Sequence, residues 1–134
     1  MQYAEQQLLL DALRASGGNK TRKLDFVMAD AQQKGIDVVV TWAGVQSNHC
    51  RQTLAFCRML GMDCHLVLTG DEPKVRQGNL LIFTILGAHL HFIGEDGDAA
   101  GYSEALVKKL QAEGKRVMLV PIGASVPLGA LGYV

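Results

Sequence analysis

The order of segments along the chain constrains the fold more than any other feature. Stretches with helical periodicity alternate with short, β-rich stretches, and glycines stand at the joints between them. This alternation is typical of a parallel sheet covered by helices. The sequence therefore predicts an α/β fold with an open, three-layer parallel sheet. Because 134 residues suit one domain, we expect a single domain over residues 1–134.

The individual elements follow from apolar periodicity and from glycine or cap residues at their ends. Strands are expected at residues 36–42, 64–68, 89–93 and 116–120. Helices are expected at residues 3–15, 20–33, 79–86 and 102–113, and from a cap at Ser47 or Asn48 to Gly61. Residues 129–134 are expected to begin a further helix, which is an abrupt ending for a complete domain.

The composition argues against several classes of partner. Thirteen basic residues balance thirteen acidic ones, so no net charge draws the surface towards nucleic acid or anionic membranes. A small neutral molecule or another protein is the expected partner. The apolar stretches are far shorter than the ~20 residues that cross a bilayer. The first residues lack the pattern of a secretory signal, so a cytoplasmic location is expected.

The spacing of cysteines and histidines does not favour a metal site. Cys50, Cys57 and Cys64 match neither a disulfide framework nor the close pairs of zinc sites, so buried, reduced thiols are expected. His89 and His91 would share one face of a strand and could bind a metal, but solvated strand histidines are the more frequent case. No metal is predicted.

A glycine pair precedes two lysines in residues 17–23, Gly-Gly-Asn-Lys-Thr-Arg-Lys. Glycine permits backbone conformations closed to other residues, and a helix start favours anions, so the segment suits a phosphate. A positive neighbour and low-polarity surroundings would make Lys20 a better nucleophile towards an aldehyde. Taken alone, the pattern more often describes a turn followed by solvated lysines, and the frame of a Walker loop is missing.

A second polar segment, Gln46-Ser47-Asn48-His49, follows a predicted buried strand and opens a helix, which is where open parallel sheets bind ligands. Its backbone N–H groups can hold a carboxylate, Ser47 can pass a proton, and Asn48 can hydrogen-bond an oxygen on a cofactor ring. The alternative is an ordinary Ser/Asn helix cap. His49 has no acidic neighbour in sequence to orient it as a base, so we expect it to contribute through its backbone.

Four blocks, in the same order and at similar spacing, resemble the family of D-cysteine desulfhydrases and 1-aminocyclopropane-1-carboxylate deaminases. The blocks are residues 17–26, 43–52, 78–81 and 121–125 with 128–133. The resemblance covers the chain from about Ser16 onward. It implies a fold-type II pyridoxal-phosphate (PLP) enzyme, usually dimeric, with residues 16–128 resembling the small domain and residues 129–134 starting the next helix.

The resemblance also implies a role for each site residue. Lys20 would be the Schiff-base lysine, and Lys23 would reach towards the PLP phosphate. Asn48 would bond the hydroxyl oxygen of the cofactor ring. Ser47, Asn48 and His49 would hold the carboxylate of a small amino-acid substrate, with Ser47 a candidate in proton transfer. The expected activity is that of a PLP-dependent lyase or deaminase.

Two departures from the family pattern lead to alternatives. Residues 1–15 are expected to form a helical lead-in that the family lacks, and family members continue far beyond the Leu-Gly-Ala-Leu-Gly-Tyr block. We therefore expect a truncated member, either a fragment of a longer protein or a chain completed by a second polypeptide, with a homo-oligomer or a complementing polypeptide as the expected partner. Whether the chain alone binds PLP stays open. The alternative is an inactive, stand-alone α/β domain that acts as an oligomeric binding or interaction module. A plain Rossmann domain would lack its GxGxxG turn here.

Overall fold

The computed structural model describes residues 27–120, 132 and 133. One sheet runs in the spatial order β3-β2-β1-β4-β5. Its strands are β1 (Val38–Gly44), β2 (Asp63–Thr69), β3 (His89–Phe92), β4 (Val117–Val120) and β5 (Gly132–Tyr133). The helices are α3 (Asn48–Leu60), α4 (Asn79–Ile85) and α5 (Ala99–Ala112), and residues 27–33 are also helical. The helix predicted at 3–15 and the first part of that at 20–33 lie outside the described residues.

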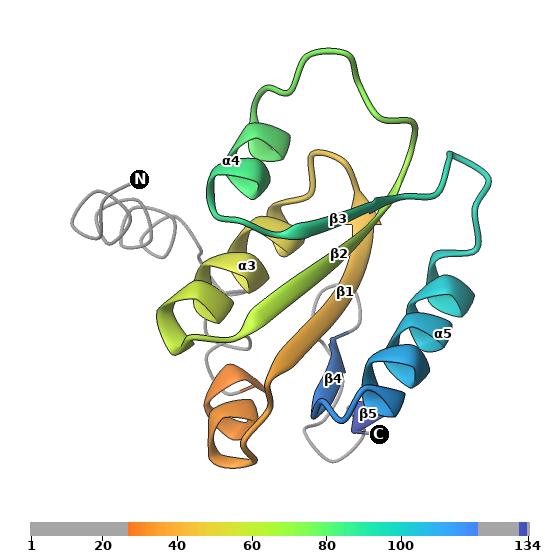
Figure 1. Ribbon diagram of the computed structural model, residues 1–134. Helices are drawn as coiled ribbons and strands as arrows, with labels where there is room; N and C mark the ends of the chain where they lie inside the picture. The colour runs from red at the N-terminus through yellow and green to blue at the C-terminus, as the bar shows by residue number, and fades with distance from the viewer. Residues whose placement is uncertain (1–26, 121–131, 134) are drawn as a thin grey trace.

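The strand order reverses beside β1. The chain moves outward from β1 to β2 and β3, then returns to the other side of β1 with β4, and these four strands are parallel. Because crossovers between parallel strands are right-handed, a reversal of direction moves the connecting helix to the opposite face. Accordingly, α3 and α4 cover one face of the sheet and α5 covers the other (Figure 1). The predicted three-layer α/β fold is confirmed.

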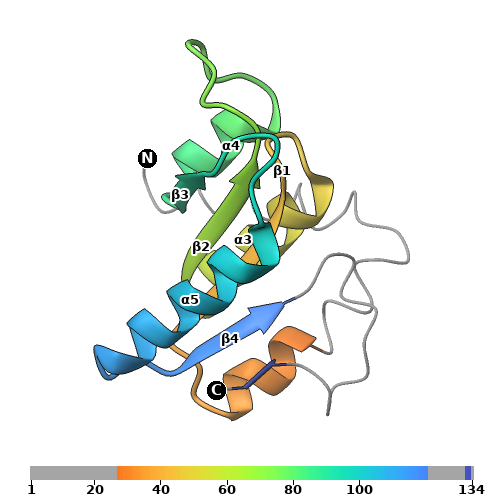
Figure 2. The same ribbon diagram turned by 90° about the vertical axis from the view of Figure 1, so that its right-hand side faces the viewer.

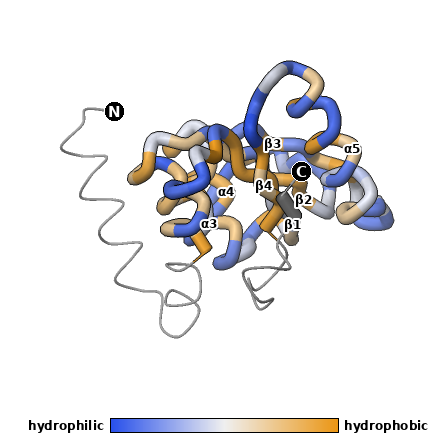
Figure 3. The backbone as a smooth tube through the Cα atoms, turned by 90° about the horizontal axis from the view of Figure 1, so that it is seen from below, coloured by the Kyte–Doolittle hydropathy of each residue, from blue (hydrophilic) through white to orange (hydrophobic). Residues whose placement is uncertain are grey.

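Each face of the sheet has its own core. On one face, Leu54 of α3 and Phe83 of α4 are fully buried. On the other, Val107 and Leu110 of α5 pack with Val40 of β1. Figure 2 shows α5 lying across the strands. In Figure 3, hydrophobic residues gather at the sheet and hydrophilic residues lie on the periphery. Burial on both faces explains why β1 begins with three consecutive valines.

Local signals set most of the helix ends. Ser47 caps α3 by accepting a hydrogen bond from the Cys50 N–H at 3.1 Å, and Gly61 ends it with a φ of 73°. Both were predicted from the sequence. The start of α5 was not, since the helix begins at Ala99 instead of Tyr102. The Asp98 carboxylate accepts from the Gly101 N–H at 3.1 Å and so caps an earlier first turn.

Two further predictions differ from the structure. The strand expected at residues 36–42 is β1, Val38–Gly44, and it ends later than expected because Ala43 and Gly44 pair with β2. The helix expected over 129–134 is contradicted at residues 132 and 133, which form β5, antiparallel to β4. Without β5, this edge of β4 would present unpaired backbone groups, so strand pairing supplies hydrogen bonds that a new helix would not.

Among the described residues, no helix combines the length and apolar character needed to span a bilayer.

Candidate functional site

The turn between β1 and α3 lies at the carboxyl edge of the sheet, beside the reversal of strand order. The Ser47 N–H donates to the Gly44 carbonyl at 3.1 Å and closes the turn. The first turn of α3 then begins at Asn48 and contains no acidic residue. Its N–H groups and the positive end of the helix dipole face the same edge, so the position favours an anion. Open parallel sheets bind ligands at such a reversal.

The Asn48 side chain joins a set of amides that link α3 to α4. Asn79 Nδ2 donates to Asn48 Oδ1 at 3.0 Å and to the Gln46 carbonyl at 2.8 Å. Gln46 Oε1 in turn accepts from the Asn79 N–H at 2.9 Å, and Gln46 Nε2 donates to the Gln77 carbonyl at 3.1 Å. The second and third sequence blocks therefore meet at this edge. We call Gln46, Asn48 and Asn79 the amide network.

The Ser47 hydroxyl has one role fixed by the helix. Its oxygen accepts from the Cys50 N–H, which leaves the hydroxyl proton as a donor. A hydroxyl in this state can donate to a ligand oxygen at the edge of the sheet. The cap interpretation and the functional interpretation of Ser47 are therefore compatible.

The His49 side chain points into the protein. His49 is buried, and its Nε2 lies 2.8 Å from Thr41 Oγ1, which also donates to the Val120 carbonyl at 2.6 Å. A carbonyl only accepts, so it takes the single hydroxyl proton of Thr41, and Thr41 Oγ1 must then accept from His49 Nε2–H. The imidazole thus ties α3 to the middle of β1 and, through Thr41, to the end of β4. Any contact between His49 and a ligand would have to come from its backbone.

The structure brings together Ser47, Asn48 and His49 but does not reach the two predicted lysines. Lys20 and Lys23 lie outside the described residues. Sequence reasoning overlooked Thr41 and the roles of Gln46 and Asn79. In the sequence, the resemblance block at residues 78–81 is the signal that points to Asn79. Nothing local to Thr41 indicates that it meets Val120, because the contact follows from strand order.

The three cysteines are buried and free, as predicted. Burial raises the pKa of Cys50 to about 12, with a smaller contribution from the neighbouring Cys64, against a lowering by the Ser47 hydroxyl. A hydrogen bond with Cys57, together with burial, raises the pKa of Cys64 well above its usual value. Thiols that stay protonated at neutral pH are poor nucleophiles, so Cys50 and Cys64 serve packing.

A second polar group lies on the α5 face, away from the amide network. His65 Nδ1 and His91 Nε2 are 2.9 Å apart, and His91 Nδ1 lies 3.0 Å from the Tyr102 hydroxyl. The His89 ring stacks on His65 with centroids 4.4 Å apart. We call His65, His89, His91 and Tyr102 the histidine cluster. The sequence placed His89 and His91 on one face but missed their pairing with His65 and Tyr102.

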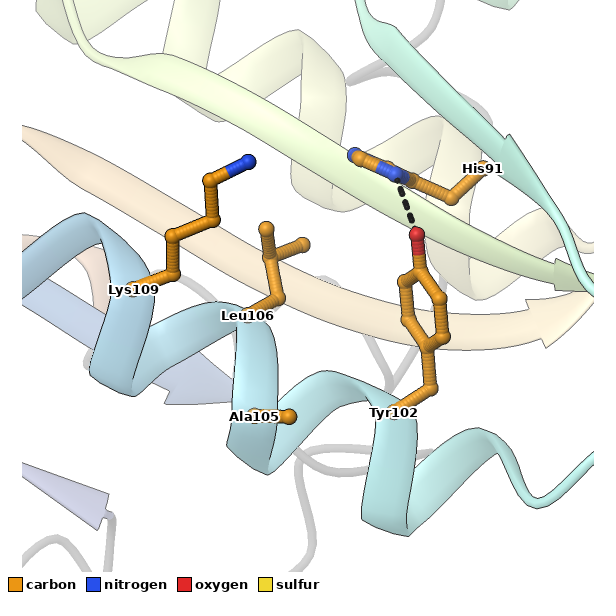
Figure 4. A pocket seen from close by; sticks show the side chains of 5 residues that line it. All are labelled: His91, Tyr102, Ala105, Leu106 and Lys109. Carbon is orange, nitrogen blue, oxygen red and sulfur yellow. Dashed lines mark hydrogen bonds between the residues drawn. The ribbon is translucent and has the colours of Figure 1, made fainter.

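The histidine cluster borders a small cavity of about 240 Å³. His91 and Tyr102 form one side, and Leu106 and Lys109 of α5 form the other (Figure 4). Burial, with the nearby His89 and His91, lowers the pKa of His65 to about 4. Burial, followed by His89 and Lys109, also lowers the pKa of His91. Both rings are therefore neutral at pH 7, and no group of three or more metal-ligating side chains within the described part of the chain is arranged to hold a metal ion.

Comparison with known proteins identifies similar sequences over nearly the whole chain. A family model described as "Pyridoxal-phosphate dependent enzyme" matches residues 7–134. The bifunctional D-cysteine desulfhydrase/1-aminocyclopropane-1-carboxylate deaminase of Arabidopsis thaliana is 40% identical, over 87% of this chain and 31% of the relative. The D-cysteine desulfhydrase of Serratia proteamaculans is 41% identical, over 90% of this chain and 38% of the relative.

A solved structure agrees with the sequence matches. It is described as an ACC deaminase homologue, is 36% identical and superposes with a TM-score of 0.75, over 84% of this chain and 34% of that chain. The chain thus spans roughly a third of the length of the relatives it matches.

Proposed function

Because this chain belongs to the pyridoxal-phosphate dependent enzyme family, we propose that it supplies one wall of the cofactor and substrate site of a lyase or deaminase acting on a small amino acid. One observation carries the proposal. At the carboxyl edge of the sheet, Asn48 Oδ1 already accepts from Asn79, so the Asn48 amide offers Nδ2 as a donor beside the first turn of α3. A hydrogen-bond donor and an anion-favouring helix start therefore lie next to each other.

These groups fit PLP and an amino-acid carboxylate. The ring hydroxyl oxygen of PLP carries negative charge when the cofactor is bound, and it needs a donor, which Asn48 Nδ2 provides. The substrate carboxylate needs several N–H or O–H donors, which the backbone of Ser47, Asn48 and His49 and the hydroxyl of Ser47 would provide. No acidic residue in the first turn of α3 opposes either anion.

The cofactor, when bound, supplies an electron sink that stabilises negative charge at the substrate α-carbon. The chain supplies attachment, orientation and proton traffic. By family resemblance, Lys20 would hold the cofactor through its side-chain amine, and Lys23 would neutralise phosphate charge. Ser47, whose hydroxyl proton is available because its oxygen caps α3, would donate that proton near the reacting carbon.

The substrate class is taken from the relatives. They are named for D-cysteine and 1-aminocyclopropane-1-carboxylate, and we propose one of these two small amino acids for the protein to which this chain corresponds. Sulfide release from D-cysteine and ammonia release from 1-aminocyclopropane-1-carboxylate separate the two.

We also propose a homo-oligomer located in the cytoplasm. Leu81 and Ile85, one helical turn apart on α4, are each 42% exposed. Large exposed side chains on a helix suit a protein interface, and burying them in a second copy removes apolar surface from water. Sedimentation of the wild type beside a Leu81→Ser, Ile85→Ser double variant tests this. A wild type that sediments as a monomer contradicts the proposal.

Chemical trapping tests the attachment of the cofactor most directly. The chain is incubated with PLP, reduced with borohydride, digested and mapped by mass spectrometry. We expect the pyridoxyl label on Lys20, loss of that label in Lys20→Ala, and a weaker but still Lys20-specific label in Lys23→Ala. Equal labelling of surface lysines such as Lys108 and Lys109, unchanged by Lys20→Ala, contradicts the proposal.

A further inference from the structure

We infer that Asn79 is a positioning residue that fixes the polarity of the Asn48 amide, so that Asn48 faces a bound ring oxygen with its Nδ2 donor. The inference rests on the proposed function, since it concerns the same edge of the sheet. It assigns to the amide network a task beyond joining α3 to α4. Without a neighbour that settles the matter, an asparagine side chain can turn over and present either oxygen or nitrogen.

The orientation of Asn79 is fixed by a backbone group. Its side-chain nitrogen lies 2.8 Å from the Gln46 carbonyl oxygen, and a carbonyl oxygen only accepts. The atom in contact must therefore be Nδ2, whichever way the amide would turn in isolation. The two hydrogens of that nitrogen serve two acceptors, and the second acceptor is Asn48 Oδ1 at 3.0 Å.

The orientation of Asn48 follows from that of Asn79. The atom that receives the Asn79 hydrogen must be Asn48 Oδ1, since an amide nitrogen does not accept. Asn48 Nδ2 is then left on the other side of the amide, and no described residue accepts from it. Asn48 is exposed at the edge of the sheet, so this donor points to where a ligand would lie.

The position of Asn79 is held by a second pair of contacts. Gln46 Oε1 accepts from the Asn79 N–H, while Gln46 Nε2 donates to the Gln77 carbonyl, so backbone groups define both ends of the Gln46 amide as well. Gly78, just before α4, has a φ of 59°, and a Cβ there would come within 2.6 Å of Gln46 Oε1. A glycine at this position therefore leaves the space that Gln46 occupies.

Two substitutions at Asn79 separate polarity from packing. Asn79→Asp keeps the shape but replaces the donor with an acceptor, so Asn48 must turn its Nδ2 towards the new carboxylate and its oxygen towards the ligand. The bond to the Gln46 carbonyl is lost in both Asn79→Asp and Asn79→Leu. Asn79→Leu removes the donor without adding an acceptor, so the Asn48 amide becomes free to adopt either orientation. Gln33→Glu, at an exposed position outside the network, makes the same change from amide to carboxylate as a control for charge.

PLP binding to the full chain, followed by absorbance and fluorescence titration, is the first measurement. We expect the affinity to fall roughly ten- to a hundredfold in Asn79→Asp, less in Asn79→Leu and little in Gln33→Glu, in line with the loss of a hydrogen bond to a charged group. The absorption maximum of bound cofactor should shift in Asn79→Asp. If Asn79→Leu weakens PLP binding at least as much as the isosteric Asn79→Asp, or if the absorption maximum of bound cofactor is the same in Asn79→Asp and in the wild type, the inference is overturned.

The second measurement needs no cofactor. In the ligand-free, ¹⁵N-labelled chain, the Asn48 side-chain amide should exchange rapidly with solvent, and in Asn79→Asp it should become protected and move downfield. The same Asn48 signals in both chains overturn the inference. If the wild type fails to bind PLP, the proposed function fails, yet the amide signals still decide the positioning role; if PLP binds equally well to the wild type and to Asn79→Asp, only the positioning role fails.

Discussion

The amide network, at the edge of the sheet, and the histidine cluster, on the face covered by α5, are two networks of hydrogen-bonded side chains. They differ in the groups that hold their ends. The amide network ends on backbone groups, the Gln46 and Gln77 carbonyls and the Asn79 N–H. The histidine cluster ends on the Tyr102 hydroxyl, which can donate or accept, and its bonds join rings that can exchange tautomers. A backbone N–H only donates and a backbone carbonyl only accepts. The hydrogen bonds of the amide network therefore have one fixed direction, and those of the histidine cluster do not.

This difference assigns different capacities to the two regions. Because its hydrogen bonds run in one direction, the amide network presents a defined donor, which suits recognition of a particular ligand atom. The histidine cluster responds to acid instead, because its imidazoles have lowered pKa values. When neighbouring rings are protonated, their positive charges repel each other. The hydrogen bond between Thr41 and His49 resembles those of the amide network, because the Val120 carbonyl fixes which of the two side chains donates.

The largest loss of stability is expected where hydrogen bonds of fixed direction are removed from the protein interior. Thr41→Val keeps the shape of the side chain but removes both the acceptor for His49 Nε2 and the donor to Val120, at a site with no exposed surface. We expect a loss of about 2 to 4 kcal/mol in the free energy of unfolding. Urea denaturation measures it. Thr41→Ser, which keeps the hydroxyl, should lose only about 1 kcal/mol; equal losses in both variants would show that the hydroxyl does not matter.

Next comes the glycine before α4. Gly78→Ala forces a positive φ on alanine and also displaces Gln46, so we expect a loss of about 2 to 3 kcal/mol. Gly87→Ala is the control for a positive φ alone, because Gly87 has a φ of 77° and open space around it. It should lose about 1 to 2 kcal/mol from the backbone alone. If the two variants unfold at the same urea concentration, the network adds no stability at α4.

Acid should weaken the fold through the histidine cluster. In the folded protein the pKa of His65 is lowered to about 4 from an ordinary 6.5. Below pH 6.5, therefore, His65 takes up a proton in the unfolded chain but stays neutral in the folded one. Stability is therefore full above pH 6.5 and falls as the pH drops towards 4. After allowing for screening of a half-buried ring, we expect about 1 to 2 kcal/mol.

The test compares urea midpoints at pH 7.5, 6 and 5 in the wild type and in His65→Gln. The variant should show a smaller loss over this range, because it no longer carries the proton-binding group. A wild type that becomes more stable on acidification would contradict this account of the cluster.

The smallest effect is expected at the open end of the histidine cluster. Tyr102→Phe removes the hydroxyl that bonds His91 Nδ1, but Tyr102 is 42% exposed and water can replace the bond. We expect at most about 1 kcal/mol, measured by urea denaturation. A loss as large as that in Thr41→Val would mean that the hydroxyl holds the cluster as firmly as a backbone group does.

Sequence patterns predicted the features that depend on neighbours along the chain. The valine run in β1, the cap at Ser47 and the end of α3 at Gly61 were all recognisable, because each rests on residues within one turn or strand. The missed start of α5 at Ala99 was also local, since Asp98 carried a cap signal that helical periodicity did not weigh. The position of the polar turn at the carboxyl end of β1 was likewise predicted from element order.

Contacts between distant segments were beyond the sequence. Gln46 and Asn79 meet because α4 docks beside α3, and that docking depends on how buried side chains such as Leu54 and Phe83 fill the core. His65 meets His89 through the register of β2 with β3, and a slip of one residue would turn the rings to opposite faces. Strand order brings Thr41 to Val120. Sequence periodicity predicts on which face of a helix or strand a residue lies, but it does not predict which residues it contacts there.

The direction of the amide network can be measured through its hydrogen bonds. In the ¹⁵N,¹³C-labelled wild-type chain, a scalar coupling across the hydrogen bond should connect Asn79 Nδ2 with the carbonyl carbon of Gln46. We predict this coupling together with rapid solvent exchange of the Asn48 side-chain amide. A coupling from Asn48 Nδ2 to the side-chain carbonyl of Asn79 would mean the reverse orientation and would contradict the claim that this edge presents Asn48 as a donor.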